Sequence, residues 1–578
     1  MAMTKFSTLP AIYREERTST AIDAIANEFY EKQLELDPER ATLAGRTGRE
    51  SEYGDYSPAG RLQRITLIRQ TLEKLRHAAP VDDVDRVTLD AMNERLGLEV
   101  ELFEAGLGDW ELNNIESPVQ NIRAIFDQMK RETPEDWKNI AARLHNVDGA
   151  TAGFIQSLDA AREKGNISPR RQIDIVLEQI SAYTTEGGFF DEVAAEVAAA
   201  APEHADFATE GATRAKAGYE ELSTYLKDTL YPQAGEQDAV GEKRYSLYSR
   251  QFLGSVVDLD ETYRWGVEEL DRIIAEQKAT AEEIKPGATI EEAKKILDAD
   301  PERTLHGTDA LRQWMQTLSD SAVEALGRKY FVIEGAMREL ECMIAPTQEG
   351  GIYYTAPSPD FERPGRMWWS VPEGEDTFGT WRETSTVYHE GVPGHHLQSA
   401  VAAAMAETMN QWRANAVWVS GHGEGWALYA ERLMEELGFL SDAGDRMGML
   451  DAQRMRAARV VFDIGLHCGK EIPSRWVEEL GLEPGIWDAD SGFAFLKANL
   501  DLSPGQLRFE FLRYLGWPGQ APSYKIGQRI WEQLRDEARA AGTAGEDDRD
   551  FHTRALKLGS MGLDSLRRAL SMDAPGAN

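Results

Sequence analysis

The sequence has little of what several classes of protein require. It contains only two cysteines, Cys342 and Cys468, in 578 residues, which is too few for a disulfide framework. We therefore expect a cytoplasmic protein in a reducing compartment. The first ten residues lack the apolar stretch of about 7–15 residues that marks a signal peptide, and no apolar run approaches the roughly 20 residues that span a membrane. We expect no membrane partner.

Runs of lysine and arginine are also missing. The chain has 63 basic and 99 acidic residues, which gives a formal charge of −36. An acidic surface repels nucleic-acid phosphates and anionic lipid heads, so we expect no nucleic-acid partner. Hydrophobic residues make up 42% of the chain, which is enough to bury a core and excludes a disordered protein. The oligomeric state stays open, with a homodimer as one alternative.

Residues 18–326 carry apolar side chains at spacings of three and four among alanine, leucine and charged residues. This pattern predicts packed helices. Helix starts are expected where a small polar residue precedes proline, at Ser57, Thr133 and Ser168. We interpret residues 1–328 as a helical scaffold half and residues 329–578 as a catalytic half, with one continuous domain as the alternative.

The pattern changes between residues 329 and 371. Segments rich in β-branched and aromatic residues alternate there with glycine, proline and aspartate, at residues 330–333, 341–344, 352–354 and 367–369. This predicts one small antiparallel β-sheet in a mainly α protein. Helical periodicity resumes near Thr384, with a break expected around residues 420–423.

Histidine is concentrated in one part of the chain. Five of the ten histidines lie between His389 and His467, and three of them stand in the string His-Glu-Gly-Val-Pro-Gly-His-His that ends at His396. Imidazole and carboxylate suit a borderline-soft divalent metal. A regular helix would bring residues i and i+4 together, but here position i+4 is Pro393, which breaks the helix. We predict that a loop of about two extra residues returns His395 to that position, with His396 as the substitute if the loop holds three.

A third ligand should come from a neighbouring helix. Glu424 begins a predicted helix after the glycine-containing segment 420–423, and its carboxylate is our candidate. Glu431 lies two turns further along this helix and could orient a metal ligand through a hydrogen bond. The alternatives are a first-turn glutamate favoured by the helix dipole, and histidines that only cap helix ends.

Two further features could serve a substrate. Arg459, Asp463 and His467 are spaced by four residues and share one face of a predicted helix. They form either a solvated salt bridge or a buried row in which Asp463 orients the other two. A Gly/Pro-rich loop later in the chain could hold Arg513 and Tyr524 over a cleft.

Together these motifs resemble a large bacterial family of unknown function. The resemblance rests on Tyr388–Gln398, Glu424–Glu431, the row Arg459, Asp463 and His467, and Pro518–Gly527, and it extends from about Ile22 to Leu570. That family is similar to the Taq-type zinc carboxypeptidases, gluzincin-like metallopeptidases that bind zinc through His-Glu-x-Gly-His and a later glutamate. The resemblance implies a large helical metallopeptidase-like fold with a deep cleft.

The resemblance also assigns roles. It implies that His389, His395 and Glu424 bind one zinc ion, with cobalt or manganese as alternatives, and that Glu390 is the general base. The chain departs from the carboxypeptidase motif by two additional residues before Gly394.

We therefore expect a zinc-dependent hydrolase of peptide bonds, either a carboxypeptidase or an oligopeptidase acting on short peptides. Glu390 would take the proton of the attacking water. Tyr524 or His467 would donate to the oxyanion. This expectation rests on the predicted metal ligands His389, His395 and Glu424 and on the resemblance to the zinc carboxypeptidases.

Recognition of the peptide is assigned to other residues. Arg459 or Arg513 would bind the substrate carboxylate, and the strand at Tyr354 would pair with an extended peptide. The alternative from another class is a non-catalytic helical protein that holds a peptide or a small ligand in its cleft.

Overall fold

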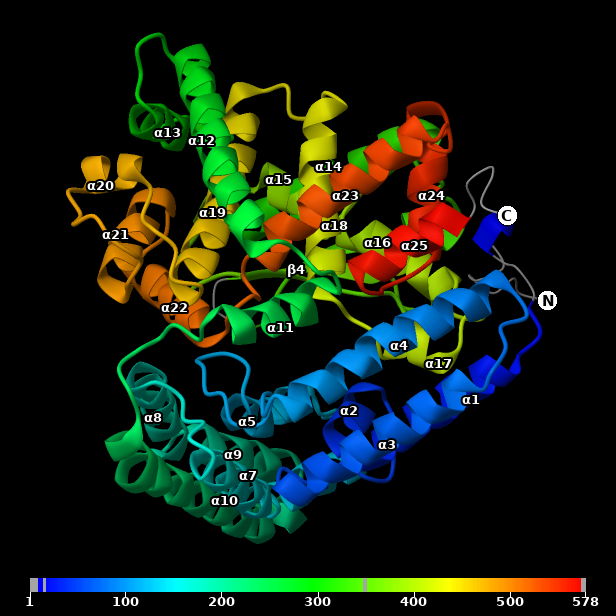
Figure 1. The fold of residues 1–578 in the computed structure, drawn as a ribbon, viewed down its shortest axis with the longest axis vertical. Helices are drawn as coiled ribbons and strands as arrows, with labels where there is room; N and C mark the ends of the chain where they lie inside the picture. The colour runs from blue at the N-terminus through cyan, green and yellow to red at the C-terminus, as the bar shows by residue number, and fades with distance from the viewer. Residues whose placement is uncertain (1–8, 14–16, 347–350, 573–578) are drawn as a thin grey trace.

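Helices fill most of the chain, as the sequence pattern predicts. The computed structural model describes residues 9–13, 17–346 and 351–572 (Figure 1). The first eight residues, part of the segment from which we expect no signal peptide, lie outside this range. Among the described residues, no helix is both long enough and apolar enough to cross a membrane.

The first ten helices form the lower part of the molecule in Figure 1. They are α1 (Ala21–Leu36), α2 (Pro38–Leu43), α3 (Pro58–Arg76), α4 (Asp83–Glu104), α5 (Pro118–Gln128), α6 (Pro134–Leu144), α7 (Val147–Arg162), α8 (Arg170–Thr184), α9 (Phe189–Ala200) and α10 (Ala205–Tyr225).

The remaining helices lie mainly in the upper part, although the short helix Gln411–Asn415 lies beside α1 in the lower part. They are α11 (Glu242–Leu253), α12 (Leu259–Ile284), α13 (Ile290–Asp298), α14 (Thr308–Lys329), α15 (Thr380–Glu390), α16 (His395–Ala404), α17 (Gln411–Asn415), α18 (Ser420–Glu436), α19 (Ala443–His467), α20 (Ser474–Leu480), α21 (Ala489–Asn499), α22 (Pro504–Gly516), α23 (Ser523–Ala540), α24 (Arg549–Lys557) and α25 (Leu563–Met572).

Local sequence explains several helix starts. Ser57 caps α3, and Thr133 caps α6 in a reciprocal capping box with Asp136, as side chains that accept from free amides at helix starts do. The third expected start differs by one residue, because Pro169 and not Ser168 is the N-cap of α8.

The strands form two small sheets. β1 (Thr304–His306) pairs antiparallel with β5 (Thr377–Gly379). β2 (Leu340–Ile344), β4 (Gly365–Ser370) and β3 (Gly351–Thr355) lie in the order β2-β4-β3, with β2 parallel and β3 antiparallel to β4. A small antiparallel sheet is therefore present, but the strands expected at residues 341–344, 352–354 and 367–369 form the mixed sheet.

Residues 330–333 do not form the strand that their composition suggested. Phe331 and Ile333 are buried, and the Phe331 ring stacks on His552 at 4.9 Å between centroids. Burial against helices, and not strand pairing, uses these apolar residues.

The predicted break at residues 420–423 is wrong, because α18 already begins at Ser420. The glycines there allow close packing. A Cβ on Gly421 would lie 2.8 Å from a Leu253 methyl group, and one on Gly425 would lie 2.5 Å from the Gly527 backbone. Helix α18 consequently packs closely along α23.

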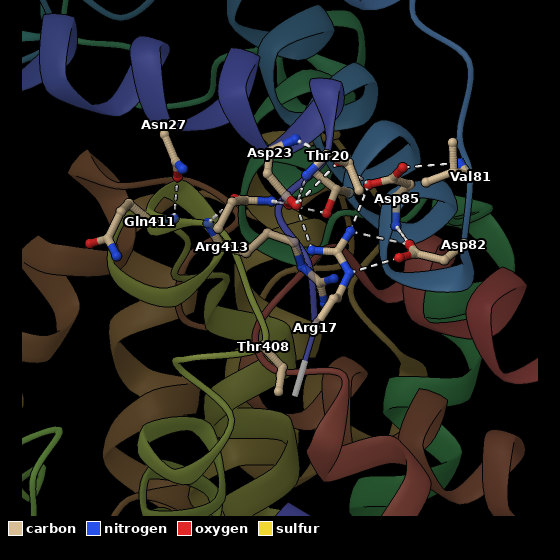
Figure 2. A network of polar contacts seen from close by, with 12 residues as sticks. Arg17, Thr20, Asp23, Asn27, Val81, Asp82, Asp85, Thr408, Gln411 and Arg413 are labelled. Carbon is tan, nitrogen blue, oxygen red and sulfur yellow. Dashed lines mark hydrogen bonds and ion pairs between the residues drawn. The ribbon is translucent and has the colours of Figure 1, made fainter. Parts of the chain in front are cut away.

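Helices α11 to α14 lie with the later helices in space, and α12 packs along α19. The lower and upper parts are joined by a buried network around Arg17 (Figure 2). Its guanidinium donates to Asp23, Asp82 and Asp85 at 2.5, 2.8 and 2.7 Å. Asn410, the N-cap of α17, donates to Asp23 at 3.3 Å. We call these residues the Arg17 network.

Candidate metal centre

A short loop separates the two histidines of the motif. Helix α15 ends at Glu390, and α16 begins at His395. The Gly394 amide donates to the Tyr388 carbonyl at 3.1 Å. A Cβ on Gly394 would lie 1.8 Å from the His389 carbonyl oxygen, so only glycine fits here. The expected interruption is present, as a four-residue loop between two helices and not as a bulge within one.

The loop is held from α18. The Trp426 indole nitrogen donates to the Pro393 carbonyl at 2.9 Å, and Trp426 itself is fully buried. The peptide bond between Val392 and Pro393 is cis. The motif around Glu424 therefore positions the histidine loop as well as supplying a carboxylate.

Three side-chain atoms converge beside this loop. The Nε2 atoms of His389 and His395 lie 3.4 and 3.5 Å from the same Oε2 atom of Glu424. Ligand bonds of about 2.0–2.2 Å in a tetrahedral arrangement separate neighbouring ligand atoms by about 3.3–3.6 Å. Donor atoms of His389, Glu390 and His395 also lie within 4.8 Å of one another. The donor atoms of His389, His395 and Glu424 thus have the spacing that one small cation requires.

Glu431 sets the tautomer of His389. The Nδ1–H of His389 donates to Glu431 Oε1 at 2.8 Å, and Nε2, which faces Glu424, is the nitrogen that would bind a metal. Burial lowers the pKa of His389, but hydrogen bonds with Glu424 and Glu431 outweigh it and raise the pKa to about 10. Burial raises the pKa of Glu424, yet His395 and His389 hold it well below its usual range. This donor arrangement is typical of a metal-binding histidine supported by a carboxylate.

A buried chain of hydrogen bonds continues behind Glu431. Gln453 donates to Glu431 Oε2 at 3.3 Å, and Lys525 Nζ donates to Gln453 Oε1 at 2.6 Å. Lys525 also pairs with Glu269 at 2.9 Å. The sequence reasoning missed Gln453 and Lys525, although Lys525 stands next to Tyr524 in the last motif.

The site has an excess of carboxylates. Glu390, Glu424 and Glu431 lie together, and in the part of the chain that the structure describes none forms an ion pair with lysine or arginine. Burial raises the pKa of Glu390, while the charges of the two histidines and of Arg456 act in the opposite direction. Uncompensated buried charge is costly. The donor set therefore suits a bound divalent cation such as zinc, which accepts both imidazole and carboxylate.

His396 is engaged elsewhere. Its Nε2–H donates to the Met337 carbonyl and its Nδ1 accepts from the Tyr354 hydroxyl, both at 2.9 Å. Burial lowers the pKa of His396 to about 4, so the ring is neutral with neither nitrogen free. A Cβ on Gly365 would lie 2.1 Å from the Tyr354 hydroxyl oxygen, so glycine makes this contact possible. His395, not His396, faces Glu424.

The row on α19 is buried and not solvated. Asp463 accepts from the Tyr245 hydroxyl at 2.7 Å and from the Gly519 amide at 2.9 Å. The Nε2–H of His467 donates to the Tyr514 carbonyl at 2.9 Å. Asp463 therefore bonds to neighbouring elements. Of the two alternatives, the row is buried, but within the described part of the chain Asp463 forms no hydrogen bond with Arg459 or His467 that would orient them.

The predicted guanidinium groups share one carboxylate. Arg459 and Arg513 each lie 3.0 Å from Glu510, and Arg513 also donates to Gln520. Among the described residues, Nη1 of Arg459 has no hydrogen-bond partner. The Arg459 guanidinium lies 5.1 Å from the centre of the Tyr524 ring. Two cations against one anion leave net positive charge beside Tyr524.

Tyr524 is electrostatically linked to the convergent carboxylate. Burial first, and then the charge of Glu424, raise the pKa of the Tyr524 phenol. The phenol therefore stays protonated near neutral pH and can donate a hydrogen bond. Sequence reasoning also missed Arg456, whose Nε has no hydrogen-bond partner among the described residues.

A pocket of about 710 Å³ opens between the two parts of the molecule. Helices α1, α3 and α4 form one wall, and α17, α18 and the segment before α23 form the other. Glu424 and Gln520 line it, so the candidate metal centre and the Arg513 group both adjoin the same cavity. Of the residues predicted for the site, Glu424 is the one that lines this pocket.

Comparisons with known proteins agree on the fold and leave the activity open. The family model described as "Bacterial protein of unknown function (DUF885)" matches residues 38–570. A protein from Colwellia psychrerythraea described as a "putative lipoprotein" has a similar crystal structure, with a TM-score of 0.80 and 20% identity over 95% of this chain and 98% of that one. A "putative lipoprotein of unknown function" from Shewanella oneidensis gives a TM-score of 0.71 and 16% identity, with 96% and 100% covered. No curated protein matches significantly.

Proposed function

The chain belongs to this bacterial family of unknown function, and from that premise we propose that it is a metal-dependent hydrolase of peptide bonds. The observation that carries the proposal is the convergence of His389 and His395 on one oxygen of Glu424, at 3.4 and 3.5 Å. The resemblance of the motif to that of the Taq-type zinc carboxypeptidases supports zinc as the ion. Cobalt and manganese remain alternatives.

When bound, a zinc ion supplies a Lewis acid that lowers the pKa of the attacking water toward about 7 and polarises the scissile carbonyl. Glu390 is the proposed general base. Its burial, which raises the pKa of its carboxyl group, favours a carboxylate that accepts a proton from water and passes it to the leaving nitrogen. Glu390 is placed for both proton transfers because its carboxylate lies within 4.8 Å of the donor atoms of His389 and His395.

Tyr524 is the proposed oxyanion donor. Its phenol is protonated near neutral pH and is coupled to Glu424. His467 is the weaker candidate, because the Tyr514 carbonyl accepts its Nε2–H. Removal of one such donor typically lowers kcat by about 10²–10³-fold.

Short peptides are the proposed substrates. The net positive charge of Arg459 and Arg513 around Glu510 suits a terminal carboxylate. Strand β3, which carries Tyr354, lies at the edge of its sheet, and an edge strand can pair with an extended peptide. These features support a carboxypeptidase more than an oligopeptidase, since only an enzyme that acts at the end of a chain needs a carboxylate site.

Metal analysis tests the proposal. Protein purified without added metal should contain about one zinc per chain, and Glu424→Ala should lose it while its circular dichroism stays unchanged. Glu435→Ala is the matched control, because Glu435 lies on the same helix but pairs with Arg432. It should keep the metal.

Hydrolysis of acylated dipeptides by the metal-loaded protein completes the test. A folded chain that contains no metal, and gains none on dialysis against zinc, would contradict the hydrolase and favour a protein that only binds a peptide or small ligand in its cleft. We also propose a cytoplasmic location. Recovery of the protein in the membrane fraction of cells that express it natively would disprove this location.

A further inference from the structure

Trp418 is an exposed aromatic residue beside the candidate metal centre. It lies in the segment between α17 and α18, and 60% of its surface is exposed. Among the described residues it is the only exposed tryptophan. Its ring lies 6.3 Å from the His395 ring, measured between centroids, and it lines the pocket that Glu424 also lines.

The position of the indole is built into α18. A Cβ on Gly423 would lie 2.3 Å from Cη2 of Trp418, so the ring packs directly over the backbone of the first turn. Gly423 immediately precedes Glu424. The indole is thus supported on one side by α18 and open to the pocket on the other.

The same pocket contains further aromatic surface. Phe252 and Trp517 line it and pack edge to face at 5.5 Å between centroids. Aromatic side chains supply large contact area and prefer offset or edge-to-face partners. All three rings line the pocket that Glu424 also lines.

Positively charged residues on the opposite wall do not alter this character. Arg61 lies 3.1 Å from Asp109 and Arg95 pairs with Glu94, while Arg64 donates to the Asp55 carbonyl. The pocket lining holds four arginines (Arg40, Arg61, Arg64 and Arg95) and four carboxylates (Asp37, Glu99, Glu116 and Glu424). Because the two signs of charge are equal in number, the lining does not favour an anion. An uncharged apolar group fits better.

We propose that Trp418, Phe252 and Trp517 form a subsite for a large apolar or aromatic side chain of a peptide residue next to the metal centre. The statement that this residue adjoins the cleaved bond rests on the proposed function; the binding preference does not. The chain would accordingly prefer peptides rich in phenylalanine or leucine over peptides of small residues.

Binding can be measured without turnover. Glu390→Gln protein, loaded with zinc, is titrated calorimetrically with acetyl-Phe-Phe and with acetyl-Ala-Ala. Trp418→Ala should weaken the binding of acetyl-Phe-Phe by about tenfold and leave that of acetyl-Ala-Ala unchanged. Trp418→Phe should restore most of the loss. Gly423→Ala, which displaces the indole, should reproduce the selective loss.

Controls separate this subsite from general damage. Phe207→Ala removes an exposed aromatic residue on α10 and should change neither affinity. Trp418→Ala should retain its zinc content, since Trp418 supplies no ligand.

Equal weakening of both peptides by Trp418→Ala, no weakening of either, or no binding of acetyl-Phe-Phe to the parent would overturn the subsite. If the chain binds no zinc, the hydrolase proposal fails, and the same titration of the metal-free parent still decides the preference. Selective loss in that case would keep the subsite and discard the hydrolase.

Discussion

Two buried polar clusters in this molecule differ in their source of positive charge. In the Arg17 network (Figure 2), three aspartates surround a guanidinium that the chain itself provides. In the candidate metal centre, Glu390, Glu424 and Glu431 surround only two imidazoles. Buried carboxylates need a cation in both places. This difference supports a structural role for the Arg17 network and our proposal that the other cluster binds a metal ion.

The carboxylates of the Arg17 network accept hydrogen bonds from the guanidinium and from backbone amides of the chain itself. Arg17 reaches Asp23, Asp82 and Asp85 through three different nitrogen atoms, and these contacts connect the N-terminal segment to α1 and α4. At His389, by contrast, Nδ1 is hydrogen-bonded to Glu431, while Nε2 lies 3.4 Å from Glu424 Oε2, the distance expected between two ligand atoms of one metal ion. The predictions below test this contrast.

The largest expected effect is on catalysis. Glu390→Gln should lower the turnover of acylated dipeptides by about 10²–10⁴-fold, because an amide cannot take the proton from water. Zinc content, measured by elemental analysis, should stay at the parent value. Turnover equal to that of the parent would show that Glu390 is not the general base.

Arg17→Met should destabilise the protein by about 3–5 kcal/mol, since it leaves buried carboxylates without their cation. The melting temperature reports the loss, and zinc binding should be unchanged. Arg46→Met is the matched control, because Arg46 and Glu31 form an exposed pair worth about 0–1 kcal/mol. Equal shifts for both variants would contradict a structural role of the Arg17 network.

Glu431→Gln should weaken zinc binding by about 10–100-fold, because the hydrogen bond that orients His389 loses its charged acceptor. Competition with a fluorescent chelator measures the affinity. Glu435→Gln on the same helix should bind zinc like the parent. An unchanged affinity in Glu431→Gln would mean that the tautomer of His389 is set by another group.

The smallest expected effect is on stability and concerns His396, which does not face Glu424. Tyr354→Phe removes the hydroxyl that donates to His396 and should cost about 1 kcal/mol of stability, measured by denaturant titration, with full zinc content. His395→Ala should lose zinc under the same conditions. Loss of zinc in His396→Ala but not in His395→Ala would reverse our assignment of the second imidazole.

Much of the fold could be predicted because its signals are local. Apolar spacing predicted the helices, and Thr133 before Pro134 predicted a helix start that forms as expected. The segment 330–333 could not be predicted, since β-branched and aromatic residues suit a strand and a buried coil equally well. The glycines at 421 and 423 misled for a similar reason: glycine marks both flexible segments and close helix packing.

The candidate site was predictable only in part. Proline between two histidines indicated an interrupted helix, and the number of intervening residues limited which imidazole could return to the first. The choice between His395 and His396 required the positions of Met337 and Tyr354, which are remote in sequence. Gln453 and Trp418 lie outside all the motifs, and Lys525 lies within Pro518–Gly527 without a role that the sequence assigns, so their proximity to the site could not be predicted.

By itself, the sequence determined an acidic, mainly helical protein with an interrupted histidine motif and a later glutamate, because composition, periodicity and proline act within a few residues. Tertiary structure alone decided which donor atoms converge, which carboxylates have no lysine or arginine partner among the described residues, and which aromatic ring faces the pocket. These outcomes depend on the packing of α15, α18, α19 and α23 against one another, and side chains far apart in the chain meet only when those helices are in place.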